Sequence, residues 1–366
     1  MADKIRVGIV GATVTPGGSG WGANAHVPAL QNLSGYELKA VCTAHEETAK
    51  ASAEKFGAAL AFHDMNEMVA HPDVDLIAVV VRVPLHKQLV MAAIEAKKPV
   101  CCEWPLGAHL ADATEMADSA KAAGLQTLVG LQAQSDPAVM HARALIANDE
   151  IGEVVTVNLS VMVGAITERG DGRIWQGIRA NGANPMTIPG GHSIDALCYI
   201  LGEFSEVSAR VTTNIDMWKH AVTGADFPVD APDTVSAAGV LKSGAEVSYQ
   251  LASVPFNASG TRLEIYGRKG TLVLTSKSVN IGPSRLHLAI GNEKMAEITP
   301  PDSYRLVPKD MAAGPGRNVG QAYARFASAM QSGSTDAPDF NDAIRRHALI
   351  DAMERAHRES KVIKLA

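Results

Sequence analysis

Short apolar runs alternate with amphipathic stretches along the first third of the chain, and this alternation restricts the fold more than any other feature. The apolar runs are interpreted as strands, and the stretches between them show helical periodicity. The predicted strands are Ile5–Val10, Leu38–Cys42, Leu76–Val81, Pro99–Cys102 and Thr127–Val129, and the predicted helices are Glu46–Phe56, His86–Ala96 and Leu110–Ala123. Strands that are apolar throughout need cover on both faces, so we predict a parallel sheet between helices.

The pattern changes near residue 130, where apolar and polar residues begin to alternate within each strand-like segment. This alternation is typical of a mostly antiparallel sheet. The predicted elements are a helix at Pro137–Ala147, strands at Val154–Val163, Val207–Thr213, Val235–Leu241 and Glu246–Leu251, a hairpin of Arg262–Tyr266 and Leu272–Leu274 turned at residues 267–270, and closing helices at Val319–Met330 and Asp342–Glu359. The Gly/Pro-rich stretches 167–189 and 300–318 are predicted to be long loops.

Composition narrows the classes of partner. The 366 residues are 46% hydrophobic and 20% charged, which is ordinary for a globular protein of two domains. The net charge is −6 and there is no long basic run, so we expect neither nucleic acid nor membrane as a partner. We find no secretory signal and no run of membrane-spanning length, and we expect a cytoplasmic protein. Four cysteines without zinc-site spacing predict reducing surroundings and no metal: Cys42, Cys101, Cys102 and Cys198.

The first predicted strand ends in a glycine-rich loop that begins at Gly8–Gly11. In a dinucleotide fingerprint, glycines at fixed offsets lead into a helix whose N-terminus holds a pyrophosphate. Here Thr13 stands where G-x-G has its second glycine, and the loop then expands through residues 16–22. Because the loop joins a buried strand to a helix, we predict that the dinucleotide is held by Gly11, Thr13, Gly20 and Trp21. A flexible surface loop is the alternative.

The end of the second predicted strand should determine the choice of cofactor. An acidic residue there would accept hydrogen bonds from the adenosine ribose, but no carboxylate occupies the strand tip. Thr43 could bind a hydroxyl or a phosphate, and His45 could accompany a 2′-phosphate. These residues favour NADP slightly over NAD. Alternatively, Glu46 or Glu47 reaches back and the site uses NAD.

Several spaced motifs resemble those of one family of oxidoreductases. They are Leu76–Val83 with Pro84 and His86, residues 98–105 (KPVCCEWP), Gly130–Gln134 before Asp136-Pro137, Ile151–Val154, Gly190–Asp195 and Leu263–Leu274. In this order they resemble the glucose–fructose oxidoreductase / inositol dehydrogenase / rhizopine-catabolism (Gfo/Idh/MocA) family over essentially the whole chain. The expanded glycine loop and Glu103-Trp104-Pro105 are most similar to the branch with the fungal galactose-pathway repressor, which binds dinucleotide but need not turn over substrate.

The resemblance implies an α/β protein of two domains. An N-terminal Rossmann domain would occupy residues 1–128, and a C-terminal α/β domain with an open, mostly antiparallel sheet would occupy residues 129–366. Members of the family bind NAD or NADP, and most transfer a hydride between the nicotinamide and a sugar or cyclitol carbon. The open sheet face commonly mediates homodimers or homotetramers, so we expect such an oligomer here.

The resemblance also implies a catalytic set from which this chain departs. The family's lysine in Glu-Lys-Pro corresponds to Trp104, and its aspartate in Asp-x-Gly-x-His corresponds to Ile188, so only His192 remains. His192 is the candidate acid or base, because imidazole exchanges protons near neutral pH. Asp195, three residues on, could orient the imidazole. A capping or core role for His192 and a structural role for Asp195 are the alternatives.

Trp104 changes what the pocket could bind. An indole cannot stabilise a developing alkoxide as an ammonium does, and it offers one N–H donor and a large apolar face. A pocket built on Trp104 should prefer flatter, less hydroxylated or aromatic ligands, or should place the indole beside the nicotinamide. Packing between the domains is the alternative.

Other side chains near these motifs are candidate contacts. For the dinucleotide they are Val83, His86, Glu103, Trp104 and Gln132, and for the substrate they are Trp104, Arg173, Trp175 and His192. Capping by His86, anchoring of the turn by Glu103 and plain exposure of the loop residues are the alternatives.

Two functions are therefore predicted. The first is an NAD(P)-dependent oxidoreductase acting on a small carbonyl, hydroxyl or imine-type substrate with an altered active site. The alternative is a non-catalytic regulatory protein that binds dinucleotide, which the replacements at Trp104 and Ile188 favour.

Overall fold

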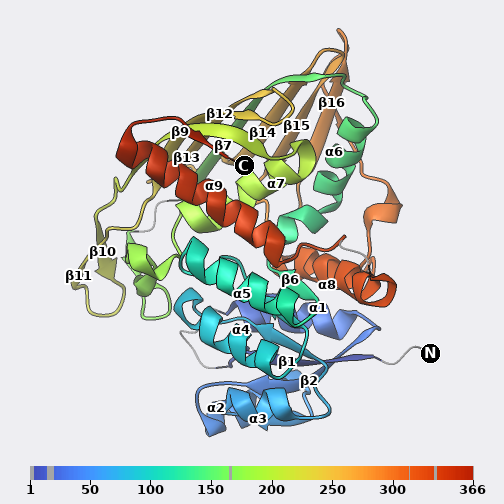
Figure 1. Ribbon diagram of the computed structural model, residues 1–366, viewed down its shortest axis with the longest axis vertical. Helices are drawn as coiled ribbons and strands as arrows, with labels where there is room; N and C mark the ends of the chain where they lie inside the picture. Colours follow the sequence, from blue (N-terminus) through green and yellow to red (C-terminus); the bar gives the residue numbers. More distant parts are fainter. Residues whose placement is uncertain (1–3, 15–19, 165–166, 313, 334–335, 366) are drawn as a thin grey trace. The chain divides into compact units, whose positions relative to one another are not determined.

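The computed structural model describes residues 4–14, 20–164, 167–312, 314–333 and 336–365, and within them the chain divides into two compact units (Figure 1). Unit 1 contains residues 1–132, 171–173 and 306–344, and unit 2 contains residues 133–170, 174–305 and 345–366. The predicted division at residue 128 lies near the first passage between the units. The return of residues 306–344 to unit 1 has no counterpart in the prediction.

Unit 1 is built on a sheet of six parallel strands among the described residues, in the order β3-β2-β1-β4-β5-β6. This order is that of a dinucleotide-binding Rossmann fold. The strands are β1 (Ile5–Val10), β2 (Tyr36–Cys42), β3 (Leu60–Phe62), β4 (Leu76–Val79), β5 (Val100–Cys102) and β6 (Thr127–Val129). The helices are α1 (Val27–Asn32), α2 (Glu46–Phe56), α3 (Met65–Ala70), α4 (His86–Glu95) and α5 (Leu110–Ala122). The predicted parallel sheet is confirmed.

The core of unit 1 is completed by the returning segment. Helix α8 (Pro315–Ser332) packs against α1 and the preceding turn, and its buried side chains join the core of the sheet. Val319, Tyr323 and Phe326 lie in one cluster with Ile9 and Leu30. Glycine at position 316 allows this close packing, because a Cβ at Gly316 would lie 3.1 Å from the backbone oxygen of Ala25.

Unit 2 is built on a mixed sheet of nine strands within the part of the chain that the structure describes. The order is β17-β16-β15-β14-β7-β13-β12-β9-β18, and every pair is antiparallel except β7 and β13. The strands are β7 (Val154–Gly164), β9 (Phe204–Thr212), β12 (Thr234–Leu241), β13 (Glu246–Val254), β14 (Gly260–Gly267), β15 (Gly270–Ser276), β16 (Arg285–Ile290), β17 (Ala296–Ile298) and β18 (Ile363–Lys364). The mostly antiparallel sheet and the hairpin turn at residues 267–270 are confirmed.

Helices cover one face of this sheet. Figure 1 shows α6 (Pro137–Ala147) and α7 (Gly191–Leu201) on the same side of the strands, and α9 (Phe340–Glu359) continues from unit 1 into unit 2. Along β13, Val247, Tyr249 and Leu251 are buried, whereas the alternating residues Ser248 and Gln250 are exposed. The other face of β13 therefore lies open, as the alternation predicts.

The two stretches predicted to be long loops contain short elements. The first holds β8 (Glu168–Arg169) and the turns η4 (Ile174–Gly177), η5 (Arg179–Asn181) and η6 (Met186–Gly190). β8 pairs with a small hairpin of β10 (Met217–His220) and β11 (Asp226–Pro228). The second stretch holds η7 (Asp302–Tyr304) and the start of α8 at Pro315. Periodicity could not predict elements as short as these.

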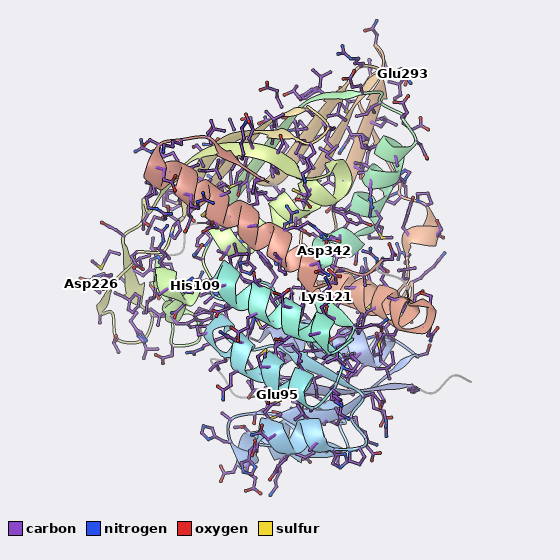
Figure 2. The ribbon with its side chains drawn as sticks, viewed as in Figure 1. Glu95, His109, Lys121, Asp226, Glu293 and Asp342 are labelled. Carbon is purple, nitrogen blue, oxygen red and sulfur yellow. The ribbon has the colours of Figure 1, made fainter. Side chains whose placement is uncertain are left out.

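Charged side chains lie mainly on the outside. Figure 2 shows Glu95, Lys121 and Asp226 at the surface, and all three are exposed. No described helix is long and apolar enough to cross a membrane. The described residues also contain no group of three or more His, Cys, Asp or Glu side chains that could hold a metal ion.

Candidate dinucleotide and active site

The turn after β1 requires glycine. Gly11 has a φ of 98°, and a Cβ there would lie 2.0 Å from the backbone oxygen of Val80. A Cβ at Gly22 would likewise lie only 3.0 Å from the backbone nitrogen of Ala12. The turn between β1 and the following helix is therefore tight. A dinucleotide site needs such a turn, because the backbone has to come close to a phosphate. Part of the predicted glycine loop, residues 15–19, lies outside the described residues.

The helix after this turn begins with a wide π-helical turn, η1 (Gly22–His26). Gly20 precedes it with a φ of 69°, and its oxygen accepts a hydrogen bond from the Asn24 backbone N–H at 2.8 Å. Trp21 is half-buried and packs against the core of unit 1, and its Nε1 has no hydrogen-bond partner among the described residues. Thr13 is also half-buried. π turns are frequent at functional sites, and the use of this segment to hold a dinucleotide stays a prediction.

The turn after β2 is held by the hydroxyl groups of two threonines. Thr43 Oγ1 donates to the backbone oxygen of His45 at 3.0 Å and lies 2.6 Å from Thr48 Oγ1. His45 is exposed and forms the N-cap position of α2 without a capping hydrogen bond from its side chain. Thr43 therefore shapes the turn, whereas the imidazole of His45 is open to a ligand.

The side chain of His86 contacts the backbone of the loop after β5. The peptide bond between Trp104 and Pro105 is cis, and the indole of Trp104 is only 4% exposed. His86 Nδ1 lies 3.0 Å from the oxygen of Pro105, and Nε2 lies 3.2 Å from the oxygen of Val81. Burial lowers the pKa of His86, so its imidazole is neutral near pH 7. These contacts account for the burial of His86, and its predicted contact with a dinucleotide stays a prediction.

Glu103 is held by two residues that the sequence analysis did not select. Its Oε1 lies 2.8 Å from Nε2 of His26, and Nδ1 of the same imidazole lies 2.8 Å from the hydroxyl of Tyr323. The carboxylate also lies against Gly130, where a Cβ would come within 2.6 Å of Oε1. No local pattern could reveal this cluster, because its members are far apart in the chain. The one available clue was a histidine at the start of a helix that the glycine loop enters.

Two further predicted dinucleotide contacts lie in unit 1. Val83 begins the short turn η2 (Val83–Leu85) after β4 and is buried. Gln132 follows β6 and is 1% exposed, and neither polar atom of its amide has a hydrogen-bond partner within the described chain. A buried amide without partners is costly, so Gln132 is the side chain of this set that most needs a ligand or water.

In unit 2, His192 is the second residue of α7 and is 2% exposed. The π turn η6 leads directly into this helix and carries Ile188, which is half-buried. Gly190 is the last residue of the turn. A Cβ at this position would lie 2.8 Å from the hydroxyl oxygen of Tyr249. The start of the helix that carries His192 is therefore closely packed.

Asp195 belongs to a buried polar cluster. Its Oδ1 accepts a hydrogen bond from Nε2 of Gln134 at 3.1 Å and lies 3.5 Å from Nε of Arg346. Arg346 is buried and also pairs with Glu203. These contacts bind Asp195 to Gln134 and Arg346, and both its action on His192 and its structural role stay predictions.

The predicted substrate residues of the loop lie in different units. Arg173 is exposed and belongs to unit 1, whereas Trp175 is half-buried in η4 of unit 2. The backbone oxygen of Trp175 accepts a hydrogen bond from Asn181 at 2.6 Å. The predicted contact of both side chains with a substrate stays a prediction.

Comparison with known proteins finds family matches for both parts of the chain. Residues 5–131 match the family described as "Oxidoreductase family, NAD-binding Rossmann fold", and residues 137–276 match "Gal80p, C-terminal domain".

Individual relatives include dehydrogenases and regulators. "Dehydrogenase aclE" of Aspergillus oryzae is 30% identical over 80% of this chain and 83% of its own length. The galactose/lactose metabolism regulatory protein GAL80 of Saccharomyces cerevisiae is 27% identical over 75% of this chain and 67% of its own length.

Solved structures share the fold over its full length. A super-repressor mutant of Gal80p from Saccharomyces cerevisiae superposes with a TM-score of 0.86 at 23% identity, covering 99% of this chain and 98% of that one. A levoglucosan dehydrogenase in complex with NADH and L-sorbose superposes with a TM-score of 0.84 at 22% identity, covering 100% and 99%.

Proposed function

Because the chain belongs to the Gfo/Idh/MocA family of NAD-binding oxidoreductases, we propose that it binds NAD(H) and transfers a hydride to or from a small carbonyl, hydroxyl or imine-type substrate. The observation that carries the proposal is the turn at Gly11, whose φ of 98° and contact with the backbone of Val80 admit no side chain. Such a turn brings backbone N–H groups close to a pyrophosphate.

NAD(H) is the proposed form of the cofactor. The family description names NAD, and a solved relative holds NADH. The slight preference for NADP drawn from Thr43 and His45 has no such support, and the hydroxyl of Thr43 already donates within its own turn. Besides Gly11, the residues proposed to hold the dinucleotide are Thr13, Gly20, Trp21, Val83, His86, Glu103, Trp104 and Gln132.

Within the reaction, the bound nicotinamide supplies or takes the hydride. His192 is proposed to take the proton from a substrate hydroxyl, or to return it to a carbonyl oxygen. Trp104 brings no charge to a developing alkoxide, so the substrate is proposed to rely on few hydroxyl contacts. Arg173 and Trp175 are proposed as further substrate contacts, and Asp195 as support for the helix that carries His192.

The test of turnover compares two histidine variants of unit 2. NADH or NAD consumption would be measured against a panel of small carbonyl, alcohol and imine substrates, with NADPH and NADP in parallel. We expect His192→Ala to lose turnover while its affinity for NADH stays unchanged. His141→Ala, a half-buried histidine of α6, should keep both. Unchanged turnover in His192→Ala would refute the role of His192.

A second candidate function is regulation without turnover. It is favoured by the replacements at Trp104 and Ile188 and by the likeness to GAL80, which is a regulatory protein. This function predicts tight NADH binding, no reaction with any substrate of the panel, and a protein partner whose binding depends on the dinucleotide. Sustained turnover of a metabolite would dismiss it.

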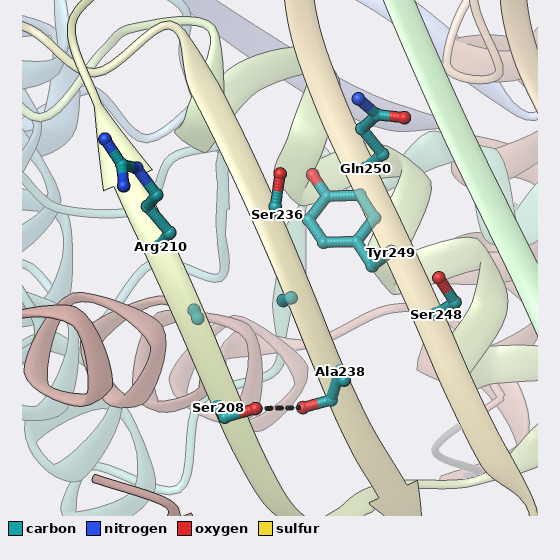
Figure 3. A pocket seen from close by; sticks show the side chains of 9 residues that line it. Ser208, Arg210, Ser236, Ala238, Ser248, Tyr249 and Gln250 are labelled. Carbon is teal, nitrogen blue, oxygen red and sulfur yellow. Dashed lines mark hydrogen bonds between the residues drawn. The ribbon is translucent and has the colours of Figure 1, made fainter. Parts of the chain in front are cut away.

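We also propose that the open sheet face forms a homodimer or homotetramer. Side chains of β9, β12 and β13 line a shallow hollow on the large sheet (Figure 3). Its residues include the exposed serines Ser236 and Ser248. Small polar side chains let two such faces approach closely. Sedimentation should show an oligomer that Ser236→Arg dissociates, and a monomeric wild type would disprove the proposal.

A further inference from the structure

A continuous chain of buried polar groups runs from helix α8 to the loop that carries Trp104. The hydroxyl of Tyr323 and the Nδ1 atom of His26 lie 2.8 Å apart, and Nε2 of His26 lies 2.8 Å from Oε1 of Glu103. All three residues are buried within unit 1.

The acceptor at one end of this chain constrains its hydrogen bonds. The carboxylate of Glu103 only accepts, so Nε2 of His26 donates to it. The hydroxyl of Tyr323 lies within hydrogen-bond distance of the other ring nitrogen, Nδ1, and a hydroxyl can either donate or accept there. The hydroxyl thereby holds the imidazole in the orientation that donates to the carboxylate.

Glu103 is left with one oxygen for another donor. Its carboxylate is clamped between the imidazole of His26 and the backbone of Gly130. No hydrogen bond from the described part of the chain reaches Oε2, and the side chain is 12% exposed. A carboxylate with a fixed orientation and one open oxygen suits a hydroxyl or N–H group of a bound molecule.

We propose that His26 and Tyr323 are positioning residues that orient Glu103 to accept a hydrogen bond from the bound dinucleotide, so that helix α8 helps to set dinucleotide affinity. The inference rests on the proposed dinucleotide site. Neither residue touches the ligand. The hydroxyl of Tyr323 acts by holding the imidazole of His26 at Nδ1, and His26 acts through the orientation of the carboxylate.

Helix α8 offers a matched control for this inference. The hydroxyl of Tyr36 donates to the backbone oxygen of Tyr323 at 2.7 Å, and the two rings are in contact. Tyr36→Phe therefore removes a buried hydroxyl and one hydrogen bond at the same helix, as Tyr323→Phe does, but it leaves the chain to Glu103 intact. The two variants should lose similar unfolding free energy and differ in affinity.

The experiment is a fluorescence titration of NADH with the full-length protein. We expect the Kd to rise about fivefold in Tyr323→Phe and to stay within about twofold of the wild type in Tyr36→Phe, which corresponds to the loss of one orienting hydrogen bond. In a Glu103→Gln background, Tyr323→Phe should change the Kd no further, because the group it orients has been altered. His26→Gln, which keeps an N–H donor for Glu103, should bind NADH more tightly than His26→Ala.

The outcomes separate this inference from the proposed function. A wild type that fails to bind NADH overturns both. A wild type that binds, together with a Tyr323→Phe variant of equal affinity, overturns the positioning role alone. Equal losses of affinity in Tyr36→Phe and Tyr323→Phe would also overturn it, because they would reflect general loosening of α8.

Discussion

At the scale of single residues, Gly11 carries a constraint that can be measured. Alanine at this position would combine an unfavourable φ with a clash against the oxygen of Val80. We expect Gly11→Ala to lose at least about 1–3 kcal/mol of unfolding free energy from backbone strain alone, and to lose NADH binding. Denaturant unfolding and NADH titration would check both effects.

Gly57 provides the control for that substitution. It has a φ of 72° at the end of α2, but a Cβ there would meet open space. Gly57→Ala should therefore cost about 1 kcal/mol from strain and leave NADH binding unchanged. If both variants bind NADH as the wild type does, the turn at Gly11 does not hold a dinucleotide.

His86 gives the protein a dependence on pH. Burial lowers its pKa in the folded state below the ordinary value of 6.5, so the unfolded chain binds more protons than the folded chain as the pH falls below 6.5. The contribution of neutral His86 to stability is complete above that pH and is lost progressively below it. In His86→Asn, unfolding free energy should fall less between pH 7 and pH 5 than in the wild type. An equal fall in both proteins would assign the effect to other groups.

The sequence could predict that the turn after the first strand needs glycine at Gly11, because that need depends on the local backbone. It could not predict the partners of Glu103. His26 is 77 residues away from Glu103, and Tyr323 is 297 residues away from His26. Contacts at such separations leave no periodicity in a single sequence, and only the folded unit brings them together.

At the scale of elements, the helix that carries His192 depends on a partner in α9. Arg346 of α9 neutralises Asp195 of α7 and Glu203 beyond the end of that helix. We expect Arg346→Met to cost about 3–5 kcal/mol of unfolding free energy, because two buried or half-buried carboxylates lose their shared cation. The double variant Asp195→Asn/Arg346→Met should recover part of this loss.

The same helix supplies a control for Arg346. Arg355 is exposed and lies near Asp351 and Glu359, at 3.9 and 3.6 Å, one turn away on either side. Arg355→Met should change the unfolding free energy by no more than about 0.5 kcal/mol, because exposed pairs along a helix contribute little. Thermal unfolding of the variants would show the difference, and comparable losses would contradict the importance of the buried cluster.

Strongly patterned elements were predictable. β1, α2, β6 and α6 have the predicted bounds, and the hairpin of β14 and β15 turns where it was expected. β3 was missed: it has three residues, as β6 does, but none of its side chains is buried, so no apolar run marked it. The π turns before α1 and α7 were also beyond prediction, because π-helical turns are rare in proteins.

At the scale of the whole molecule, unit 1 needs its returning segment. The core around β1 and α1 includes Val307, Val319, Tyr323 and Phe326 from the last sixth of the chain. A fragment of residues 1–132 should therefore expose apolar surface, bind a hydrophobic dye and unfold without a sharp transition. Joining residues 306–344 to the fragment through a flexible linker should restore cooperative unfolding. A fragment 1–132 that unfolds cooperatively on its own would contradict this prediction.

The late position of that segment also has a consequence for biosynthesis. About 200 residues separate the end of the first part of unit 1 from the end of its last part, and a ribosome adds them in roughly 10–40 s at typical rates. During this interval the sheet of unit 1 has emerged but the cover from α8 has not. The nascent chain therefore presents an apolar face to chaperones for many seconds, and unit 1 completes its folding only when translation is almost finished.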